Sequence, residues 1–223
     1  MDFLSLVREI MPQLLRGTIV TLQLTGIAIS MGFIIGTFLA LGRLYGNRSI
    51  SAICNGYIQF FRGTPLLVQL FIVYYGLPRY GIRLSSFTAA LIGLGLNSAA
   101  YQAEYFRGAI QSIGEGQMMA ARAIGMSKFK SIKNIIIPQA LRIVIPSWSN
   151  ELIYTLKYSS VAYMIGAPEL MAQAKFITAK NFRYFEVFIV VAFIYLVIVL
   201  VLSRILDFIE KKVRIPGLQV SGG

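Results

Sequence analysis

Long apolar runs without charged residues constrain this chain more than any other feature of its sequence. Residues 18–41 contain no Asp, Glu, Lys or Arg, and a helix of about 20 such residues crosses the hydrocarbon core of a bilayer. Hydrophobic residues make up 57% of the chain and charged residues only 13%, too few polar residues to coat a soluble domain. The runs are apolar on every side, whereas barrel strands alternate apolar and polar residues. The sequence therefore predicts an all-α membrane protein.

The same pattern along the chain predicts five transmembrane helices in a single domain, residues 1–223. In residues 1–16, apolar residues recur at helical spacing between charged ones, which predicts a separate interfacial helix bent near Pro12. The fourth span is unusually long and contains Pro138 and Pro146. The expected spans are Thr18–Leu41, Ile53–Tyr75, Ser86–Phe106, Ile135–Ile165 and Tyr184–Leu202.

The distribution of basic residues between the spans predicts an outside N-terminus and an inside C-terminus. In this orientation, eleven Lys and Arg residues lie in inner segments and seven in outer ones. The cytoplasmic tail, 204–223, carries Arg204, Lys211, Lys212 and Arg214, which we expect to contact anionic membrane lipid. Because the net charge of +12 is spread between apolar runs, no nucleic-acid binding is expected.

The lack of histidine and the single Cys54 exclude several kinds of catalytic and metal site. A Ser-His-Asp triad, a haem ligand pair, a His/Cys metal site and an intramolecular disulfide all need residues that this chain does not have. The sequence also has no Gly-x-x-x-x-Gly-Lys-Ser/Thr phosphate loop, so ATP must be handled by another polypeptide. We expect no catalytic residue, no metal site and no cofactor in this chain.

The connection between the third and fourth predicted spans is long for so compact a protein, and long connections are usually functional. Its alanine-rich residues 116–123 predict a short helix, which Gly125 ends. Ser127 can cap the turn that follows. Ile135-Ile136-Ile137-Pro138 then leads into the fourth span. We expect residues 114–130 to form a cytoplasmic loop of helix, glycine and helix.

This loop, followed at this distance by Ile-x-x-Pro, resembles the "EAA" loop of ABC importer permeases. Three further segments resemble signatures of the polar amino-acid branch of that family, which includes histidine, glutamine and arginine permeases. They are Arg62-Gly63-Thr64-Pro65-Leu66-Leu67, Ala103-Glu104-Tyr105-Phe106-Arg107-Gly108 and Asn150-Glu151-Leu152-Ile153-x-x-Leu156-Lys157. Because four motifs occur in the right order over most of the chain, we regard it as similar to type I importer permeases.

The resemblance implies a function and a set of partners. It implies a multi-pass permease subunit of the bacterial plasma (inner) membrane that takes up polar amino acids and is not itself an enzyme. It also implies a second copy or a paralogue of the chain, an extracytoplasmic substrate-binding protein, and an ATP-binding subunit dimer that carries ATP and Mg²⁺. A pathway built from only five spans per chain agrees with dimerisation.

The cytoplasmic loop of residues 114–130, called the coupling loop from here on, departs from the family pattern at one point, and so does the fourth span. The glutamate that names the loop aligns with Met119, and Tyr158-Ser159 stands where the family commonly has Asp-Thr. The loop residues expected to couple to the ATPase are Met119, Ala120, Ala121, Arg122, Ile124 and Gly125.

Two charged residues in the second and third spans are candidates for an ion pair. A charge at membrane depth is costly unless it is paired or hydrated, so such residues are functional candidates. Arg62 and Glu104 lie at depths that a long arginine side chain can bridge. A structural ion pair is the preferred interpretation, and direct contact of either residue with substrate is the alternative.

Two polar groups in the third and fourth spans are candidates for substrate binding. The spacing of Asn150, Glu151 and Tyr154 places them along one face of a helix near mid-membrane. Hydrogen bonding between helices is the alternative role for this group. A carboxylate there can meet the ammonium group of an amino acid, and two copies in a homodimer would favour cationic amino acids. The expected substrate-binding residues are Asn97, Ser98, Tyr101, Asn150, Glu151 and Tyr154.

Two other classes of protein would also use buried polar residues. A secondary transporter or channel for small polar solutes predicts inverted repeats, but no convincing repeat is found, and the cytoplasmic loop would have no role there. A membrane enzyme could use Glu104, Glu151 and Lys157 in acid-base chemistry, but no nucleophile or metal motif accompanies them.

Overall fold

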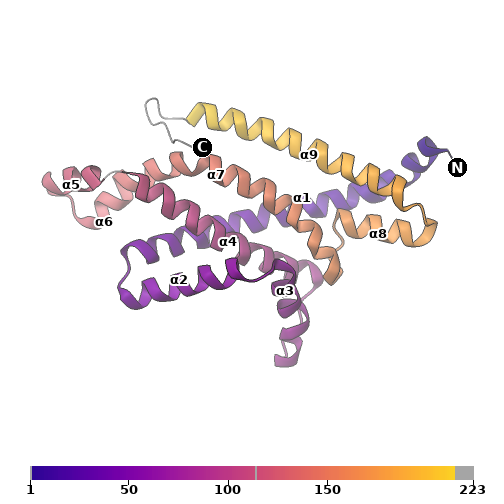
Figure 1. The fold of residues 1–223 in the computed structure, drawn as a ribbon, viewed down its shortest axis with the longest axis horizontal. Coiled ribbons are helices and arrows are strands. Elements are labelled where there is room, and N and C mark those ends of the chain that lie inside the picture. The colour runs from indigo at the N-terminus through magenta and orange to yellow at the C-terminus, as the bar shows by residue number, and fades with distance from the viewer. Residues whose placement is uncertain (1, 114, 214–223) are drawn as a thin grey trace.

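The computed structural model describes residues 2–113 and 115–213, and every regular element in these ranges is helical. α1, α4, α7 and α9 run alongside one another, and α8 and α5–α6 lie at opposite ends of the molecule (Figure 1). The N-terminal end of α1 lies at the α8 end. The helices are α1 (Phe3–Tyr45), α2 (Arg48–Gly63), α3 (Leu66–Phe71), α4 (Ser86–Ser112), α5 (Glu115–Ala123), α6 (Lys128–Ser131), α7 (Ile137–Tyr158), α8 (Leu170–Asn181) and α9 (Tyr184–Val213). α3 continues into a π-helical turn, Ile72–Gly76, and then a 3₁₀ turn, Leu77–Tyr80. α7 follows a second π-helical turn, Ile132–Ile136, and continues into a second 3₁₀ turn, Ser159–Ile165.

Two of these helices are long and apolar enough to cross a membrane by themselves, α1 and α9. The bent pair of α2 with residues 66–80 passes the same criterion as a third, broken span. α4 and α7 coincide with the third and fourth predicted spans, although they do not pass that criterion. The helical fold class is confirmed, whereas the count of five spans and the orientation of the termini stay predictions. The tail residue Arg214 and the loop residue Gly114 lie outside the described residues.

The segment expected to form a separate interfacial helix, residues 1–16, instead joins the first span. α1 runs without a break from Phe3 through Pro12. Leu6, Ile10 and Leu14 are buried against α8 and the first half of α9. A helix here was correctly predicted from the spacing of Phe3, Val7, Ile10 and Leu14, but the face that contains Ile10 and Leu14 is covered by protein.

The second predicted span, Ile53–Tyr75, is not one helix. The chain bends by 105° between α2 and the helical segment that begins at Leu66. Thr64 has an extended backbone (φ −116°, ψ 144°), because the ring of a following proline disfavours the helical conformation at the preceding residue. Figure 1 shows α3 projecting away from the other helices.

The sequence analysis missed α8. It begins after Glu169, whose carboxylate accepts hydrogen bonds from the backbone nitrogens of Met171 and Ala172, each at 2.8 Å. Such a carboxylate satisfies the free N–H groups at a helix start. α8 packs on α1 and α9 through Leu170, Ala174 and Val187, so the chain after the fourth span returns to the core.

The most extensive helix pairing joins α1 to α4, and glycines allow the two helices to approach closely. The backbone of Gly36 lies so near α4 that a Cβ there would be 2.9 Å from the Ala99 carbonyl oxygen and 3.1 Å from the Ala103 nitrogen. Gly32 faces α4 in the same way, against Gln102. Gly26, which shares the first predicted span, faces open space and has no such role.

This packing predicts that Gly36→Ala destabilises the protein. The added Cβ meets backbone atoms that cannot rotate away, so α1 and α4 must separate, at an overpacking cost of roughly 1–3 kcal/mol. Gly26→Ala is the matched control on the same helix, and it should be neutral or stabilising because alanine is the better helix former. Thermal unfolding of the purified variants in detergent measures the difference. Equal melting temperatures for the two variants would contradict the prediction.

Candidate functional site

The bend between α2 and α3 is held by two side-chain amides. Pro65 has no N–H group, so the carbonyl of Phe61, four residues earlier, lacks its helical donor. Gln69 Nε2 donates to the carbonyl oxygens of Phe61 (2.8 Å) and Thr64 (3.0 Å). Asn97 Nδ2 of α4 donates to Gln69 Oε1 (3.0 Å) and to the Phe61 carbonyl (3.3 Å). These bonds replace the missing backbone donor and fix α3 against α4.

A cavity of about 230 Å³ lies beside this bend. Its walls come from α3, α4 and α7, which bring residues far apart in the sequence to one place. Five of the six expected substrate-binding residues line it, while Asn150 is exposed on α7 and does not. The lining residues are Leu66, Leu94, Asn97, Ser98, Tyr101, Tyr105, Glu151, Tyr154, Thr155 and Tyr158.

Glu151 carries the one charged side chain among the described residues that line this cavity. It is 5% exposed and accepts a hydrogen bond from the Ser98 hydroxyl at 2.8 Å. Thr155 and Tyr105 hydroxyls lie farther away, at 3.3 Å and 3.5 Å. Within the described ranges, none of the ion pairs involves Glu151. A buried carboxylate held only by neutral donors favours a cation as its missing partner.

The proton of the Ser98 hydroxyl is directed at Glu151 by a residue behind the cavity. Gln102 is fully buried, and its Nε2 donates to the Ile29 carbonyl (3.1 Å) and to Ser98 Oγ (3.0 Å). A backbone carbonyl only accepts, so the amide nitrogen must face Ile29. Ser98 therefore accepts from Gln102 and donates its single proton to Glu151.

Two stacked tyrosines form the exposed side of the cavity. Tyr154 and Tyr158 have ring centroids 6.2 Å apart, and the ammonium of Lys157 lies 4.7 Å from the centre of the Tyr154 ring. Tyr158 is one of the two departures from the family pattern. Its place in the cavity wall shows that this departure changes the surface that a bound molecule would meet.

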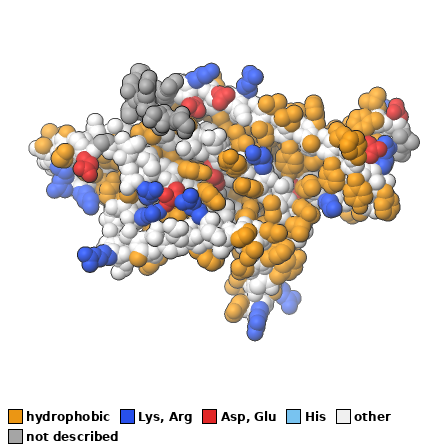
Figure 2. Space-filling view, in the orientation of Figure 1, with side chains coloured by type: hydrophobic (Ala, Val, Ile, Leu, Met, Phe, Trp, Pro, Cys, Tyr) orange, Lys and Arg blue, Asp and Glu red, His pale blue; other side chains and the backbone are white. Residues whose placement is uncertain are grey.

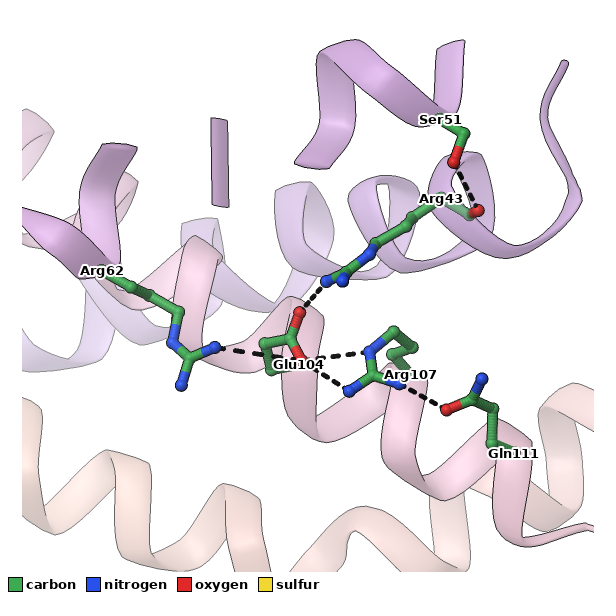
Figure 3. Close-up of polar contacts among 6 residues, drawn as sticks. All are labelled: Arg43, Ser51, Arg62, Glu104, Arg107 and Gln111. Atoms are coloured by element: carbon green, nitrogen blue, oxygen red, sulfur yellow. Dashed lines mark hydrogen bonds and ion pairs between the residues drawn. The ribbon is translucent and has the colours of Figure 1, made fainter. Parts of the chain in front are cut away.

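Glu104 is the centre of a cluster of three arginines (Figure 3). The expected pairing with Arg62 is present at 3.9 Å, but it is the longest of the contacts. Arg107 Nη2 lies 2.7 Å from Glu104 Oε2, and Arg43 contacts Oε1. The guanidinium of Arg62 also lies 5.4 Å from the centre of the Tyr101 ring. Glu104 thus joins the ends of α1 and α2 to α4.

The coupling loop has the expected helix, glycine and helix. α5 ends before Gly125, which has a left-handed backbone (φ +86°), and Ser127 caps α6 by accepting from the Lys130 nitrogen. Met119 (64%) and Ile124 (79%) are exposed, together with Phe129 (73%), which the sequence analysis did not select. Ala120, Arg122 and Gly125 are exposed as well, whereas Ala121 is buried and supports the loop from inside.

Sequence reasoning missed the two glutamines and the arginines Arg43 and Arg107. Gln69 and Gln102 are buried amides, and each stands four residues after a residue that matters to the site, Pro65 or Ser98. That spacing was the available signal, since residues four apart share a helix face. Among the described residues, no group of three or more His, Cys, Asp or Glu side chains is arranged to hold a metal ion.

Residues 29–215 match the family model described as binding-protein-dependent transport system inner membrane component. A Bacillus subtilis (strain 168) protein named YckA, a probable amino-acid ABC transporter permease, is 41% identical over 204 residues, which is 92% of this chain and 90% of the relative. A Rickettsia bellii (strain RML369-C) protein provisionally named as the glutamine transport system permease GlnP is 40% identical over 200 residues, which is 89% of this chain and 92% of the relative.

The fold is similar to that of a solved transporter. A crystal structure of an amino acid ABC transporter with histidines superposes with a TM-score of 0.88 at 40% identity, covering 95% of this chain and 99% of that one. The similarity therefore extends over most of the chain.

The cluster around Glu104 predicts that Glu104→Gln is destabilising. Three guanidinium groups would lose their shared counter-charge, at a cost between the roughly 0–1 kcal/mol of a surface pair and the roughly 3–5 kcal/mol of a buried one. Glu186→Gln removes the carboxylate of the Arg183–Glu186 pair near the start of α9 and serves as the control. Thermal unfolding in detergent at low and high salt measures both. A loss for Glu104→Gln no larger than that of the control would count against this role.

Proposed function

The chain belongs to the family of binding-protein-dependent transport system inner membrane components, and on this premise we propose that it forms the pathway of an importer for polar amino acids. Membership makes it a multi-pass membrane component without enzymatic activity of its own, and ATP hydrolysis belongs to a separate subunit. The secondary transporter, the channel and the membrane enzyme that the sequence left open are thereby set aside.

The proposed assembly contains two permease chains, identical or paralogous, two ATPase subunits and an extracytoplasmic binding protein. Each permease would contribute five spans, α1, the broken α2–α3, α4, α7 and α9, with the N-terminus outside and the C-terminus inside. The position of α5–α6 at the end of the molecule opposite the N-terminus supports this orientation (Figure 1). Hydrophobic side chains over α9 and α3 in Figure 2 suit contact with lipid, whereas charged side chains gather over α4.

The cavity around Glu151 is the proposed substrate site, and the unpaired carboxylate is the observation that carries this proposal. An amino acid brings an ammonium group that needs a partner when it leaves water, and a cationic amino acid brings a second positive group in its side chain. Glu151, held by the Ser98, Thr155 and Tyr105 hydroxyls, offers that partner without first breaking an ion pair. The aromatic walls from Tyr101 and Tyr154 suit the apolar part of a side chain. Relatives are named for amino acids, and a preference for cationic ones is this proposal's own extension.

The loop α5–α6 is the proposed contact with the ATPase. Met119, Ile124 and Phe129 present an apolar surface at the end of the molecule, and isolated apolar patches of this kind often mark protein interfaces. Because Ala121 is buried beneath, movement of the loop would be transmitted to the helices that carry it.

Glu151→Gln should selectively weaken the uptake of cationic amino acids. The substitution keeps the shape and removes the charge, and a charge-assisted hydrogen bond is worth roughly 1.5–3 kcal/mol, or about ten- to a hundredfold in affinity. Competition between arginine and glutamine for uptake into proteoliposomes that contain the assembled importer measures the preference.

Asn150→Ala is the control for this experiment, because Asn150 neighbours Glu151 in the sequence but does not line the cavity. It should leave the preference unchanged. Equal loss of both substrates in Glu151→Gln, accompanied by poor assembly, would show that Glu151 only holds helices together.

Gly125→Leu should uncouple ATP hydrolysis from uptake. A side chain at φ +86° is strained, at a cost of roughly 1–2 kcal/mol for the left-handed region, so the turn between α5 and α6 must change. Gly125→Asn should retain most uptake, since asparagine tolerates this conformation. Gly56→Leu is the control, because Gly56 lies within α2, outside the loop, with open space around it. Uptake per ATP hydrolysed is the measurement, and a normal ratio for Gly125→Leu at normal expression would refute the role.

A further inference from the structure

A second cavity, of about 350 Å³, adjoins the one around Glu151. The two cavities share Leu66, Asn97, Tyr101 and Tyr158 as wall residues, so they lie side by side. Among the described residues on its wall, the second cavity has a single charged side chain, that of Arg62. A carboxylate thus lines one cavity and a guanidinium lines the next.

Arg62 is the arginine of the Glu104 cluster that is least engaged. Glu104 Oε2 accepts from Arg107 at 2.7 Å and 3.0 Å, and Oε1 accepts from Arg43. Arg62 lies 3.9 Å from the same carboxylate, beyond hydrogen-bond distance. Its side chain is 41% exposed, compared with 25% for Arg43 and 29% for Arg107.

The direction of the Arg62 side chain is nevertheless defined. The Tyr101 ring lies 5.4 Å from its guanidinium carbon, and an aromatic face attracts a guanidinium without using its N–H donors. In Figure 3 the guanidinium of Arg62 approaches Glu104 from the side opposite Arg107. Most of its five donors therefore stay available, in the planar arrangement that matches a carboxylate.

We propose that Arg62 binds the α-carboxylate of the amino acid while Glu151, in the adjoining cavity, receives its cationic group. This inference rests on the proposed function and adds a positively charged group, Arg62, to the proposed substrate site. The zwitterion is common to all amino acids, so Arg62 would recognise the class, and Glu151 would determine the preference within it. Arg43 and Arg107 neutralise Glu104, which leaves the charge of Arg62 for the substrate.

The test measures the preference for a free carboxylate. The assembled complex of permease and ATPase, without the binding protein, is titrated with L-arginine, L-histidine and L-glutamine and with the α-carboxamide of each. The wild-type complex should favour the free acids about ten- to a hundredfold, the usual gain from charge-assisted hydrogen bonds. Arg62→Gln should abolish this preference, and Arg62→Lys, which keeps the charge without the two-pronged geometry, should retain part of it.

Arg48→Gln is the matched control, since it removes the same charge from the exposed start of the same helix. It should leave the preference for the free acid intact. A folded Arg62→Gln variant with the wild-type preference would overturn the proposal and leave Arg62 as a structural partner of Glu104. If Arg62→Gln does not assemble, an unchanged preference in Arg62→Lys overturns it equally.

Failure of the proposed function gives a different result. A wild-type complex that binds none of the amino acids or carboxamides would overturn both the substrate site and its Arg62 subsite. Binding that depends on Glu151 but shows no dependence on Arg62 would overturn the subsite alone.

Discussion

Pro65 has no amide hydrogen, so the carbonyl oxygen of Phe61 must find a donor outside the helix in surroundings where water is scarce. The chain supplies that donor twice, from Gln69 and from Asn97. The first comes from the helix beyond the break and the second from α4, so the repair also sets where both helices lie. The cavity lies beside this bend. Its position therefore depends on the two side-chain amides that replace the missing backbone donor.

The carboxylates Glu104 and Glu151 differ in the partners that they contact. One carboxylate, Glu104, balances arginines from α1, α2 and α4, while another, Glu151, is left with hydroxyl partners only. The difference between them lies in their neighbours. Glu104 links α1, α2 and α4 through ion pairs, whereas Glu151 has no ion-pair partner among the described residues.

Much of the fold followed from hydrophobic runs and short motifs. The starts of α4 and α9 were predicted to the residue, at Ser86 and Tyr184, because polar or turn residues border long apolar stretches there. The break at Thr64 was missed, although Arg62-Gly63-Thr64-Pro65 interrupts the apolar residues there, because hydropathy averaged over a whole span does not register a missing amide hydrogen. α8 was missed because much of its burial depends on α1, which is distant from it in the sequence.

The candidate site depends on contacts between helices, and reasoning from one helix at a time does not predict them. Asn97, Ser98 and Tyr101 were expected together in the third span, and all three line the cavity from α4. It placed Asn150 beside Glu151, yet Asn150 does not line the cavity, since neighbouring residues on a helix point in directions about 100° apart. Arg43 could not be assigned to Glu104 from the sequence, because their contact joins residues 61 positions apart.

Gln102 donates a hydrogen bond to Ser98, and Ser98 donates one to Glu151. This fixed direction limits how the selectivity of the proposed substrate site can change. Ser98 has a single proton, and Gln102 already occupies its oxygen. A basic residue in place of Glu151 would remove the acceptor of that proton and place another donor beside it. A switch of selectivity from cations to anions would therefore also rearrange the hydrogen bonds of Ser98 and Gln102, although Gln102 is buried and does not line the cavity. The residues that determine the selectivity of the cavity would then include one behind its wall, Gln102, as well as those that line it.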